Sequence, residues 1–416
     1  MSDPGDQVGE LREQSFEYLI IGGGAAGVSC AETIRRREVH ASVAILSADV
    51  ELPYSRVMLP SYVRGEVTRD EVFLRTRDHF VAIGVTIVTG CRIVELNHDN
   101  KWVVTEEGKK YHFGKLCITT GGRPRTLAHE GEQESSQLYH LYTLADADRL
   151  REAAEGLRGQ KWSIVGGGFI GIELANIAHH YGSEATMLVA NDQLFRKKMT
   201  KESADIIDDA LRTMGIKVIY QARVENVSWS KEGGIITTPK GTFGPSPVAV
   251  GIGIDRAQSW FGMGGVDGGI PTTMELMSPY EDIFAAGDVA VRTDARGKPL
   301  VLGNWASAVQ MGMIAGSNMT GAHVGLSVPG IYSIHAGNIH LSFVGNVLPE
   351  DAHIVTRVVN PSSRMEFGFV EGLLYAVMLM NAHHELGQCI RLLNTHATLE
   401  GREAQFADAT VTLASL

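Results

Sequence analysis

Short apolar stretches followed at once by glycines recur along this chain. Residues 18–21 and 162–165 are mainly apolar, and a glycine-rich turn follows each of them. A short apolar run bounded by turn residues is typical of a buried strand in a parallel sheet. Apolar residues then continue at helical spacing, before a further apolar run at residues 41–46 in the first case and 185–189 in the second. The pattern predicts two strand–turn–helix–strand units of an α/β fold.

The rest of the chain repeats this order and then changes character. Two stretches that combine short β-type runs with turn residues, 82–120 and 216–243, predict β-ribbons, and each leads into an apolar strand that ends in glycine. The repeated order predicts two similar domains, the second inserted into the first, and a small α+β domain after them. We place the boundaries at residues 14–122 and 248–328 for the first domain, 123–247 for the second and 329–416 for the third.

The composition fits such a fold and excludes several classes of function. With 416 residues, 44% hydrophobic and 20% charged, the chain is long enough for two or three α/β domains. A net charge of −11 argues against nucleic acid as a partner. No apolar run reaches the roughly 18–20 residues of a membrane span, and residues 1–15 lack the basic-then-apolar pattern of a signal peptide. We therefore expect a cytoplasmic protein.

The cysteines and histidines show no metal-binding pattern. The four cysteines lie far apart and form no C-x-x-C or C-x-x-x-x-C pair, which argues against a disulfide framework, a zinc site or an iron–sulfur cluster held by this chain alone. Cys30 and Cys117 are expected to be small buried hydrophobic residues. His383 and His384 are adjacent, and adjacent side chains of a strand point to opposite faces. We therefore predict no metal site.

Both glycine-rich turns have the spacing G-x-G-x-x-G. Between a buried strand and a helix, this spacing is typical of a loop that binds the pyrophosphate of a dinucleotide. The glycines permit a tight turn and a close approach of the ligand, and the helix start offers unpaired N–H groups and positive potential. Two such turns predict two dinucleotides, bound by two Rossmann-like domains. The residues are Gly22, Gly24, Ala25, Ala26 and Gly27 in the first turn, and Gly166, Gly168, Phe169, Ile170 and Gly171 in the second.

A third motif, at residues 278–290, carries the most specific resemblance of this chain. It reads S-P-Y-E-D-I-F-A-A-G-D-V-A and is followed at residues 303–310 by G-N-W-A-S-A-V-Q. With these motifs in this order, residues 16–325 resemble the FAD-dependent pyridine nucleotide oxidoreductases. The branch that they resemble is that of the rubredoxin and ferredoxin reductases, which includes FAD subunits of multi-subunit aldehyde or 2-oxoacid oxidoreductases.

The resemblance implies that the first domain binds FAD and that the second, inserted domain binds a nicotinamide nucleotide. Asp288 would accept hydrogen bonds from the ribityl chain, and Trp305 would offer its backbone N–H to the flavin from a helix start. Such a helix start stabilises the negative charge of a reduced flavin by about 0.3–2 kcal/mol. The usual place of the ribose-binding acid holds Ala48, so Asp49 or Ser47 would substitute. The further FAD residues that the resemblance implies are Arg56, Gly121, Gly287, Asn304 and Ala308.

Gly251 would bind the nicotinamide nucleotide together with the second turn. Glu173 matches a glutamate that NAD-using relatives carry near the nicotinamide. The strand at residues 185–189 ends without the acid that favours NAD and without the immediate arginine that favours NADP. The cations at residues 196–198 could reach a 2′-phosphate, although a solvated basic turn is the preferred interpretation. NAD is therefore expected in preference to NADP.

Residues 52–60 resemble the stretch that runs beneath the flavin ring, with informative departures. Val57 stands where coenzyme A disulfide reductases carry a redox cysteine, and Ser61 stands where the ferredoxin reductase branch often has a lysine. The C-x-x-x-x-C of the disulfide reductases is absent from this first stretch. Without a sulfur beside the flavin, thiol chemistry cannot carry electrons away, and they must pass directly between the flavin and an external partner.

We therefore expect an FAD-containing, NAD(H)-linked electron-transfer oxidoreductase without a redox-active disulfide. Hydride would exchange between NAD and flavin N5, and single electrons between the flavin and an iron–sulfur partner. The short third domain favours the NAD-reducing FAD subunit of a multi-subunit oxidoreductase. The alternatives are a stand-alone NADH-dependent rubredoxin or ferredoxin reductase, an NADH oxidase, and an FAD- and NADH-sensing interaction protein that resembles apoptosis-inducing factor.

Overall fold

The computed structural model describes residues 13–127, 137–256, 259–262, 268–293, 299–300, 302–326 and 329–416. Its contacts divide the chain into two units, each built from segments that are far apart in the sequence. The first unit consists of Met1–Tyr54, Phe73–Gly122 and Arg256–Leu326, and the second of Ser55–Val72, Arg123–Asp255 and Ser327–Leu416. Among the described residues, no helix is long and apolar enough to cross a membrane.

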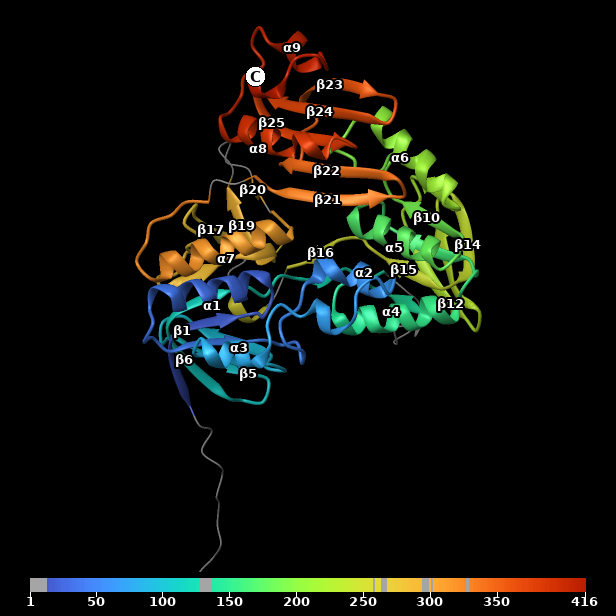
Figure 1. The fold of residues 1–416 in the computed structure, drawn as a ribbon. Helices are drawn as coiled ribbons and strands as arrows, with labels where there is room; N and C mark the ends of the chain where they lie inside the picture. The colour runs from blue at the N-terminus through green and yellow to red at the C-terminus, as the bar shows by residue number, and fades with distance from the viewer. Residues whose placement is uncertain are drawn as a thin grey trace, which may run out of the picture. The chain divides into compact units, whose positions relative to one another are not determined.

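A mainly parallel sheet forms the centre of the first unit (Figure 1). Its strands are β3 (Val85–Val88), β2 (Val43–Leu46), β1 (Gln14–Ile21) and β6 (Lys110–Ile118) in this order, then the antiparallel β5 (Trp102–Thr105) and β4 (Ile93–Asn97), with β18 (Ile283–Ala285) parallel to β6. Ile21 lies opposite Leu46 on one side and Ile118 on the other, so the carboxyl ends of these strands lie together. The sequence predicted a ribbon for residues 85–88, and this was wrong, because β3 pairs in parallel with β2.

Two helices of the first unit, α1 (Ala25–Arg37) and α7 (Trp305–Met319), pack closely against each other. A methyl group on Gly312 would lie 2.2 Å from the carbonyl oxygen of Ala26, and one on Gly316 would lie 2.6 Å from that of Cys30. Only glycine at these two positions of α7 lets the backbones approach so closely.

A parallel sheet of five strands forms the centre of the second unit. Its order is β11 (Ile216–Tyr220), β10 (Ala185–Val189), β9 (Trp162–Val165), β15 (Val248–Val250) and β8 (Leu138–Tyr139). Because β15 is buried and pairs with β9, the boundary that we predicted between residues 247 and 248 cuts through this sheet, and the contacts divide the chain after Asp255 instead. Further elements of this unit include α4 (Leu144–Gly156), α5 (Phe169–His180), α6 (Lys201–Thr213), β12 (Asn226–Ser230), β13 (Gly233–Thr238) and β14 (Gly241–Ser246).

The C-terminal part is an antiparallel sheet that groups with the second unit. Its order is β21 (Ile331–Ala336), β22 (Ile339–Gly345), β25 (Leu373–Met380), β24 (Ser363–Val370) and β23 (His353–Asn360). The helices α8 (Leu386–Asn394) and α9 (Glu403–Ala407) cover it around a core that includes Phe367 and Phe406. β21 lies beside α5 (Figure 1), and this contact joins the C-terminal sheet to the second unit.

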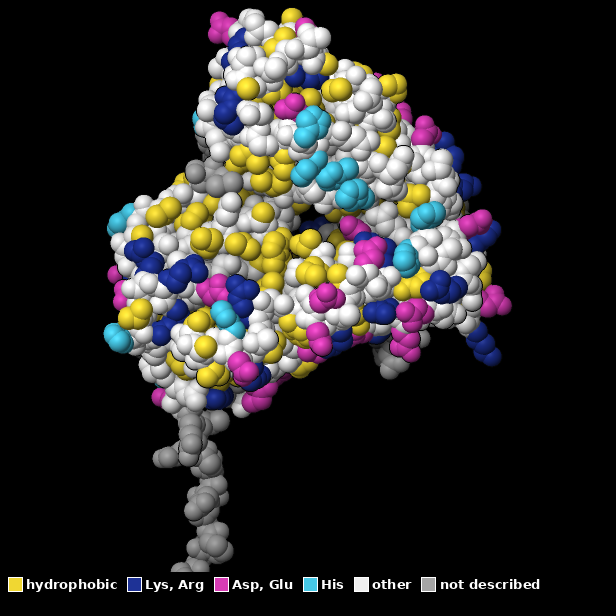
Figure 2. All heavy atoms as spheres, viewed as in Figure 1, with side chains coloured by type: hydrophobic (Ala, Val, Ile, Leu, Met, Phe, Trp, Pro, Cys, Tyr) yellow, Lys and Arg dark blue, Asp and Glu magenta, His cyan; other side chains and the backbone are white. Residues whose placement is uncertain are grey.

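Histidine side chains (cyan in Figure 2) gather over the C-terminal sheet. The rings of His335 and His340 stack at a centroid distance of 4.4 Å, and His340 lies 4.7 Å from His383. The residues from His383 to Glu385 form a 3-10 turn, so the strand that we predicted there was wrong. Within the described ranges, no group of three or more His, Cys, Asp and Glu side chains is arranged to hold a metal ion.

The segment Ser55–Val72 follows the first unit in sequence but packs in the second. Its helix α2 (Leu59–Val63) is held there by two hydroxyl groups. Tyr62 donates a hydrogen bond of 2.6 Å to Asp148 on α4, and Tyr181 donates one of 2.6 Å to the carbonyl of Val63. The predicted FAD residue Arg56 belongs to this segment, and its guanidinium lies 3.9 Å from the ring centre of Tyr142.

Candidate nucleotide-binding sites

In the first unit, the turn from β1 into α1 has the shape that its three glycines impose. Gly22 has a φ of 116°, and a methyl group on it would lie 2.4 Å from the carbonyl oxygen of Thr119. A methyl group on Gly27 would lie 2.0 Å from the carbonyl oxygen of Gly22. The turn is therefore pressed against the end of β6 on one side and against its own helix on the other.

Gly24, the N-cap of α1, faces open space instead. No heavy atom lies within 4 Å of a methyl group placed on it, and no side chain caps the helix. The first N–H groups of α1 thus lack the side-chain partner that helix starts commonly have, and the positive end of the helix dipole adds to their attraction for an anion. This is the geometry that a diphosphate group requires.

The segment after β18 and the start of α7 reach the same place. A methyl group on Gly287, whose φ is 79°, would lie 3.2 Å from Cβ of Ala26 and 3.8 Å from Cβ of Ala308. Asp288 follows directly and is half-buried. The hydroxyl of Thr120, after β6, is buried and without a hydrogen-bond partner within the described structure, as expected where a polar ligand supplies the missing partner.

Two of the predicted FAD side chains have partners within the protein. Asn304 caps α7: its Oδ1 accepts a hydrogen bond of 2.9 Å from the N–H of Ser307, and its Nδ2 donates one of 2.6 Å to the carbonyl of Leu302. The Asp49 carboxylate accepts hydrogen bonds from the Tyr54 hydroxyl at 2.7 Å and from the N–H of Glu51 at 3.1 Å. Both residues hold the shape of their loops, and their contacts with FAD stay predictions.

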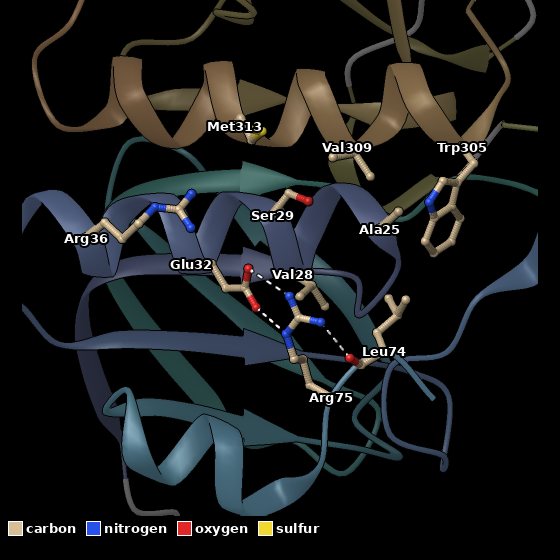
Figure 3. A pocket seen from close by; sticks show the side chains of 10 residues that line it. All are labelled: Ala25, Val28, Ser29, Glu32, Arg36, Leu74, Arg75, Trp305, Val309 and Met313. Atoms are coloured by element: carbon tan, nitrogen blue, oxygen red, sulfur yellow. Dashed lines mark hydrogen bonds and ion pairs between the residues drawn. The ribbon is translucent and has the colours of Figure 1, made fainter. Parts of the chain in front are cut away.

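A hollow of about 260 Å³ runs along α1 and α7 (Figure 3). Both helices begin at the end of the hollow where Ala25 and Trp305 lie (Figure 3). One wall is apolar, and near the other Arg75 binds Glu32 through Nε at 2.7 Å and Nη2 at 3.4 Å. The exposed Arg36 lies at the far end. The lining residues are Ala25, Val28, Ser29, Glu32, Arg36, Leu74, Arg75, Trp305, Val309 and Met313.

The second unit repeats the turn of the first. Gly166 has a φ of 118°, and a methyl group on it would lie 2.3 Å from the carbonyl oxygen of Gly251. A methyl group on Gly171 would lie 2.0 Å from the carbonyl oxygen of Gly166, and one on Gly251 would lie 2.9 Å from Cγ2 of Ile170. Gly168, the N-cap of α5, again has no side-chain cap and open space beside it. The start of α5 therefore offers a second place with the geometry that suits a diphosphate group.

Glu173 has an ion-pair partner that sequence reasoning missed. Nη1 of Arg64 lies 3.2 Å from Oε2 of Glu173, and Arg64 also binds Glu66 at 2.7 Å. Burial raises the pKa of the Glu173 carboxyl above its ordinary value, and the charge and hydrogen bond of Arg64 oppose that rise. Arg64 is the C-cap residue of α2, and it lies 109 residues before Glu173 in the chain, so no local pattern in the sequence pointed to this pair.

Each of the three cations after β10 has a neighbour of its own within the second unit. Nε of Arg196 lies 3.9 Å from Oδ1 of Asp192, and Nζ of Lys197 lies 3.4 Å from Oε1 of Glu350. Lys198 lies 5.0 Å from the ring centre of Tyr332, and burial lowers its pKa from 10.5 to about 8. The basic turn is thus not simply solvated, since its third cation faces aromatic rings.

The cysteines are inaccessible to substrates. All four are buried free thiols, including Cys30 and Cys117 in the core of the first unit, where the sequence predicted them. Burial raises the pKa of Cys91 to about 11 and that of Cys389 to about 12, and a protonated thiol is a poor nucleophile. Val57 is 62% exposed at the position where the disulfide-reducing relatives have a cysteine.

Two open helix starts, each ringed by glycines that allow close approach, fit two dinucleotides, and the family comparison agrees. Residues 16–312 match the family model described as pyridine nucleotide-disulphide oxidoreductase. The chain belongs to this family. It is a flavin-dependent pyridine nucleotide oxidoreductase whose cofactors are FAD and NAD(H).

Individual relatives extend the match over most of the chain. A p-cumate 2,3-dioxygenase system ferredoxin–NAD(+) reductase component from Pseudomonas putida is 26% identical over 91% of this chain and 90% of its own. The NADH-dependent phenylglyoxylate dehydrogenase subunit epsilon from Aromatoleum evansii is 26% identical over 84% of each chain. The crystal structure of the covalent putidaredoxin reductase–putidaredoxin complex matches with a TM-score of 0.88 over 97% of both chains at 21% identity, which establishes the shared fold.

Proposed function

We propose that this protein takes hydride from NADH and passes electrons one at a time to an iron–sulfur protein. The observation that carries the proposal is the pair of open helix starts, one in each unit, together with the burial of every cysteine. Two dinucleotides can bind, and no accessible thiol can take electrons from the flavin. Relatives that span most of this chain are reductase components for ferredoxins, which supports an iron–sulfur acceptor.

When bound, FAD supplies the conversion of a two-electron hydride donor into a one-electron donor. The residues of the first unit would hold it. The start of α1 at Gly24 binds the diphosphate, and Asp288 accepts hydrogen bonds from the ribityl hydroxyls. The start of α7 at Trp305 stabilises negative charge on the pyrimidine end by about 0.3–2 kcal/mol. These residues bind FAD and stabilise the negative charge of the reduced flavin, and they do not act as an acid or a base.

The residues of the second unit would hold NADH. The start of α5 at Gly168 binds its diphosphate, and Glu173 contacts the nicotinamide end. Arg64 holds Glu173 in place, and its charge and hydrogen bond oppose the rise that burial causes in the pKa of the Glu173 carboxyl. The rate of hydride transfer then depends on how well these groups position the nicotinamide, because this step needs no side-chain proton donor.

The hollow along α1 and α7 suits the docking of an acidic iron–sulfur protein. Trp305, Val309 and Met313 offer an apolar contact, and Met313 is 44% exposed. Arg75 is paired with Glu32. Arg36 is exposed near the end of α1, where its guanidinium donates a hydrogen bond of 2.9 Å to the Thr33 hydroxyl, and the last turn of this helix also contains Arg35 and Arg37. Basic charge around an apolar centre complements an acidic partner and speeds its association.

We further propose that the protein serves as the FAD subunit of a multi-subunit oxidoreductase, as its similarity to a phenylglyoxylate dehydrogenase subunit suggests. A stand-alone ferredoxin reductase is the second candidate, favoured by the similarity to ferredoxin–NAD(+) reductase components. All four cysteines are free buried thiols, which is consistent with a location in the reducing cytoplasm. Purification of the untagged protein from its own cells, followed by identification of the proteins that elute with it, separates the two.

Anaerobic stopped-flow reduction tests the central proposal. The purified protein is mixed with NADH, and then with an oxidised [2Fe–2S] ferredoxin. We expect rapid bleaching of the flavin absorbance, followed by rapid recovery as the ferredoxin is reduced. A flavin that binds NADH without bleaching would overturn the proposal in favour of a sensing role. A flavin that bleaches, is not reoxidised by the ferredoxin and recovers only when air is admitted would overturn it in favour of an NADH oxidase.

A further inference from the structure

The loop that joins β10 to α6 in the second unit is held in a strained shape. Phe195 has a φ of 47° and Lys197 a φ of 66°, both in the left-handed region that residues other than glycine rarely adopt. Such conformations persist only where surrounding contacts impose them. The contacts here come from two sides, the glycine turn before α5 and the C-terminal sheet.

On one side the loop touches the glycine turn. A methyl group on Gly167 would lie 2.9 Å from Cδ2 of Leu194, and the N–H of Phe195 donates a hydrogen bond of 3.5 Å to the carbonyl of Gly167. The ring of Phe195 lies 5.2 Å from that of Phe169, the first residue of α5. The loop therefore supports the turn at which the diphosphate of the nucleotide would bind.

On the other side, Leu348, which follows β22, and Glu366 on β24 form hydrogen bonds with the loop and with the start of α6. The N–H of Leu348 donates a hydrogen bond of 2.9 Å to the carbonyl of Lys197. The buried carboxylate of Glu366 accepts a hydrogen bond of 2.8 Å from the N–H of Thr200 and further ones from the hydroxyls of Thr200 and Ser203. Glu366 thus adds a negative charge at the start of α6, where the loop ends.

Aromatic rings of the same sheet pack against Phe169, the first residue of α5. The ring of Tyr332 on β21 stacks on Phe169 at 4.9 Å and 13°, and Phe343 on β22 meets Phe169 edge-on at 5.5 Å. Phe343 also lies 5.3 Å from Phe195. Nζ of Lys198 lies 5.0 Å from the ring centre of Tyr332 and 6.0 Å from that of Phe343. A cation over aromatic faces is attracted by them, which ties the loop to the rings.

We propose that Tyr332, Phe343 and Lys198 are positioning residues for the nicotinamide nucleotide. By holding Phe169 and the strained loop, the C-terminal sheet fixes the start of α5 and the loop that follows β10 in a shape that fits the diphosphate and the adenosine ribose. The inference rests on the proposed function of this turn as the NAD site. It assigns to the C-terminal sheet a part in nucleotide affinity.

The test compares variants of the full-length holoprotein in their binding of ADP-ribose, which contains the adenosine and diphosphate of NAD and lacks the nicotinamide. For Tyr332→Ala we expect the Kd, measured by isothermal titration calorimetry, to rise about 5- to 30-fold. Tyr332→Phe keeps the ring and should stay within about twofold of the unmodified protein. Val358→Ala, at a 52% exposed position of the same sheet, is the matched control and should bind normally.

Three readouts separate positioning from general damage. FAD content should be unchanged in Tyr332→Ala, because the first glycine turn and Asp288, which are proposed to bind FAD, belong to the other unit. The KM for NADH should rise while kcat changes little. Lys198→Met, which keeps the length of the side chain and removes its charge, should also weaken ADP-ribose binding, whereas Lys198→Arg should restore it.

Normal ADP-ribose binding by folded Tyr332→Ala would overturn the inference. If that variant does not fold, Lys198→Met decides by itself, and an unchanged Kd in it would overturn the inference in the same way. Failure of the proposed function looks different: the unmodified protein would then bind neither ADP-ribose nor NADH.

Discussion

At the residue scale, the glycines of the two turns divide into those that packing demands and those that a ligand demands. Gly22 and Gly27 leave no room for a methyl group within the protein itself, whereas Gly24 and Gly168 have open space beside them. Folding alone therefore does not require glycine at Gly24 and Gly168. A ligand that approaches the helix start gives the physical reason for glycine there.

Arg64 also acts at the residue scale, because its positive charge affects the pKa of one neighbour, Glu173. Because Arg64 opposes the upward effect of burial on the pKa of Glu173, its removal should raise that pKa further. In Arg64→Ala we therefore expect the acid limb of the pH profile of kcat/KM for NADH to move to higher pH. The profile is measured with ferricyanide as acceptor.

Glu66→Gln is the control for that measurement, since it removes the other ionic partner of Arg64 and leaves the pair with Glu173. Its profile should stay close to that of the unmodified protein. An acid limb that does not move in Arg64→Ala would show that ionised Glu173 has no part in NADH oxidation.

At the element scale, α1 and α7 serve two purposes at once. Their starts face the proposed FAD site, and their sides line the hollow that ends at Arg36. Gly312 and Gly316 bring the two helices into contact, which places Trp305 and Ala25 at the same end of the hollow. Close helix packing therefore joins the proposed cofactor site to the proposed docking surface.

Charge reversal in the hollow should weaken the docking of the iron–sulfur partner. In Arg36→Glu we expect the KM for an acidic [2Fe–2S] ferredoxin to rise about 5- to 20-fold at low salt, with a smaller difference at high salt, because exposed charges are screened. The rate with ferricyanide should not change. Steady-state assays at two ionic strengths make the measurement.

Lys217→Glu gives the same change in net charge at an exposed position of β11, in the other unit. It should leave the KM for ferredoxin nearly unchanged. An equal effect of both variants would mean that net charge, and not this hollow, governs the association.

At the scale of the whole molecule, the chain crosses between the two units several times, yet each unit contains one complete glycine turn. The turn at Gly22 and the residues around Asp288 belong to one unit, and the turn at Gly168 and the pair of Arg64 with Glu173 belong to the other. Loss of one nucleotide should therefore not entail loss of the other.

Gly168→Val tests this independence. The added side chain meets no protein atom within 4 Å of its Cβ, so the protein should fold and keep its full FAD content. NADH should no longer reduce the flavin, with a loss of at least about 100-fold in rate, because the side chain occupies the place that we propose for the diphosphate. The flavin spectrum and stopped-flow traces provide the two measurements.

Gly156→Val, at an equally open position at the end of α4, is the matched control and should behave like the unmodified protein. Undiminished reduction by NADH in Gly168→Val would place the nicotinamide nucleotide elsewhere.

Much of the architecture could be predicted from the sequence because its causes are local. A continuous apolar run such as residues 18–21 is stable as a strand only when both of its faces are covered, and the glycines that follow permit one kind of turn into a helix. The two turns, the strands before them and the burial of Cys30 and Cys117 follow from such local rules. The family followed from the order of these motifs.

Other features depended on contacts between residues far apart in sequence. Nothing near Arg64 predicts that its guanidinium meets Glu173, or that Lys198 faces Tyr332. The pairing of β15 with β9 places residues 248–250 in the second unit, and this pairing joins strands that are far apart in the sequence.

The sequence by itself determined the two glycine turns and the buried strands that carry them, since glycine at a crowded or left-handed position and apolar residues on both faces of a strand act within a few residues. The tertiary structure alone decided which segments belong to which unit, and which charges and rings meet beside the second turn. Those outcomes depend on how whole faces of helices and sheets pack together, and the packing energy is shared among segments that are far apart in the sequence.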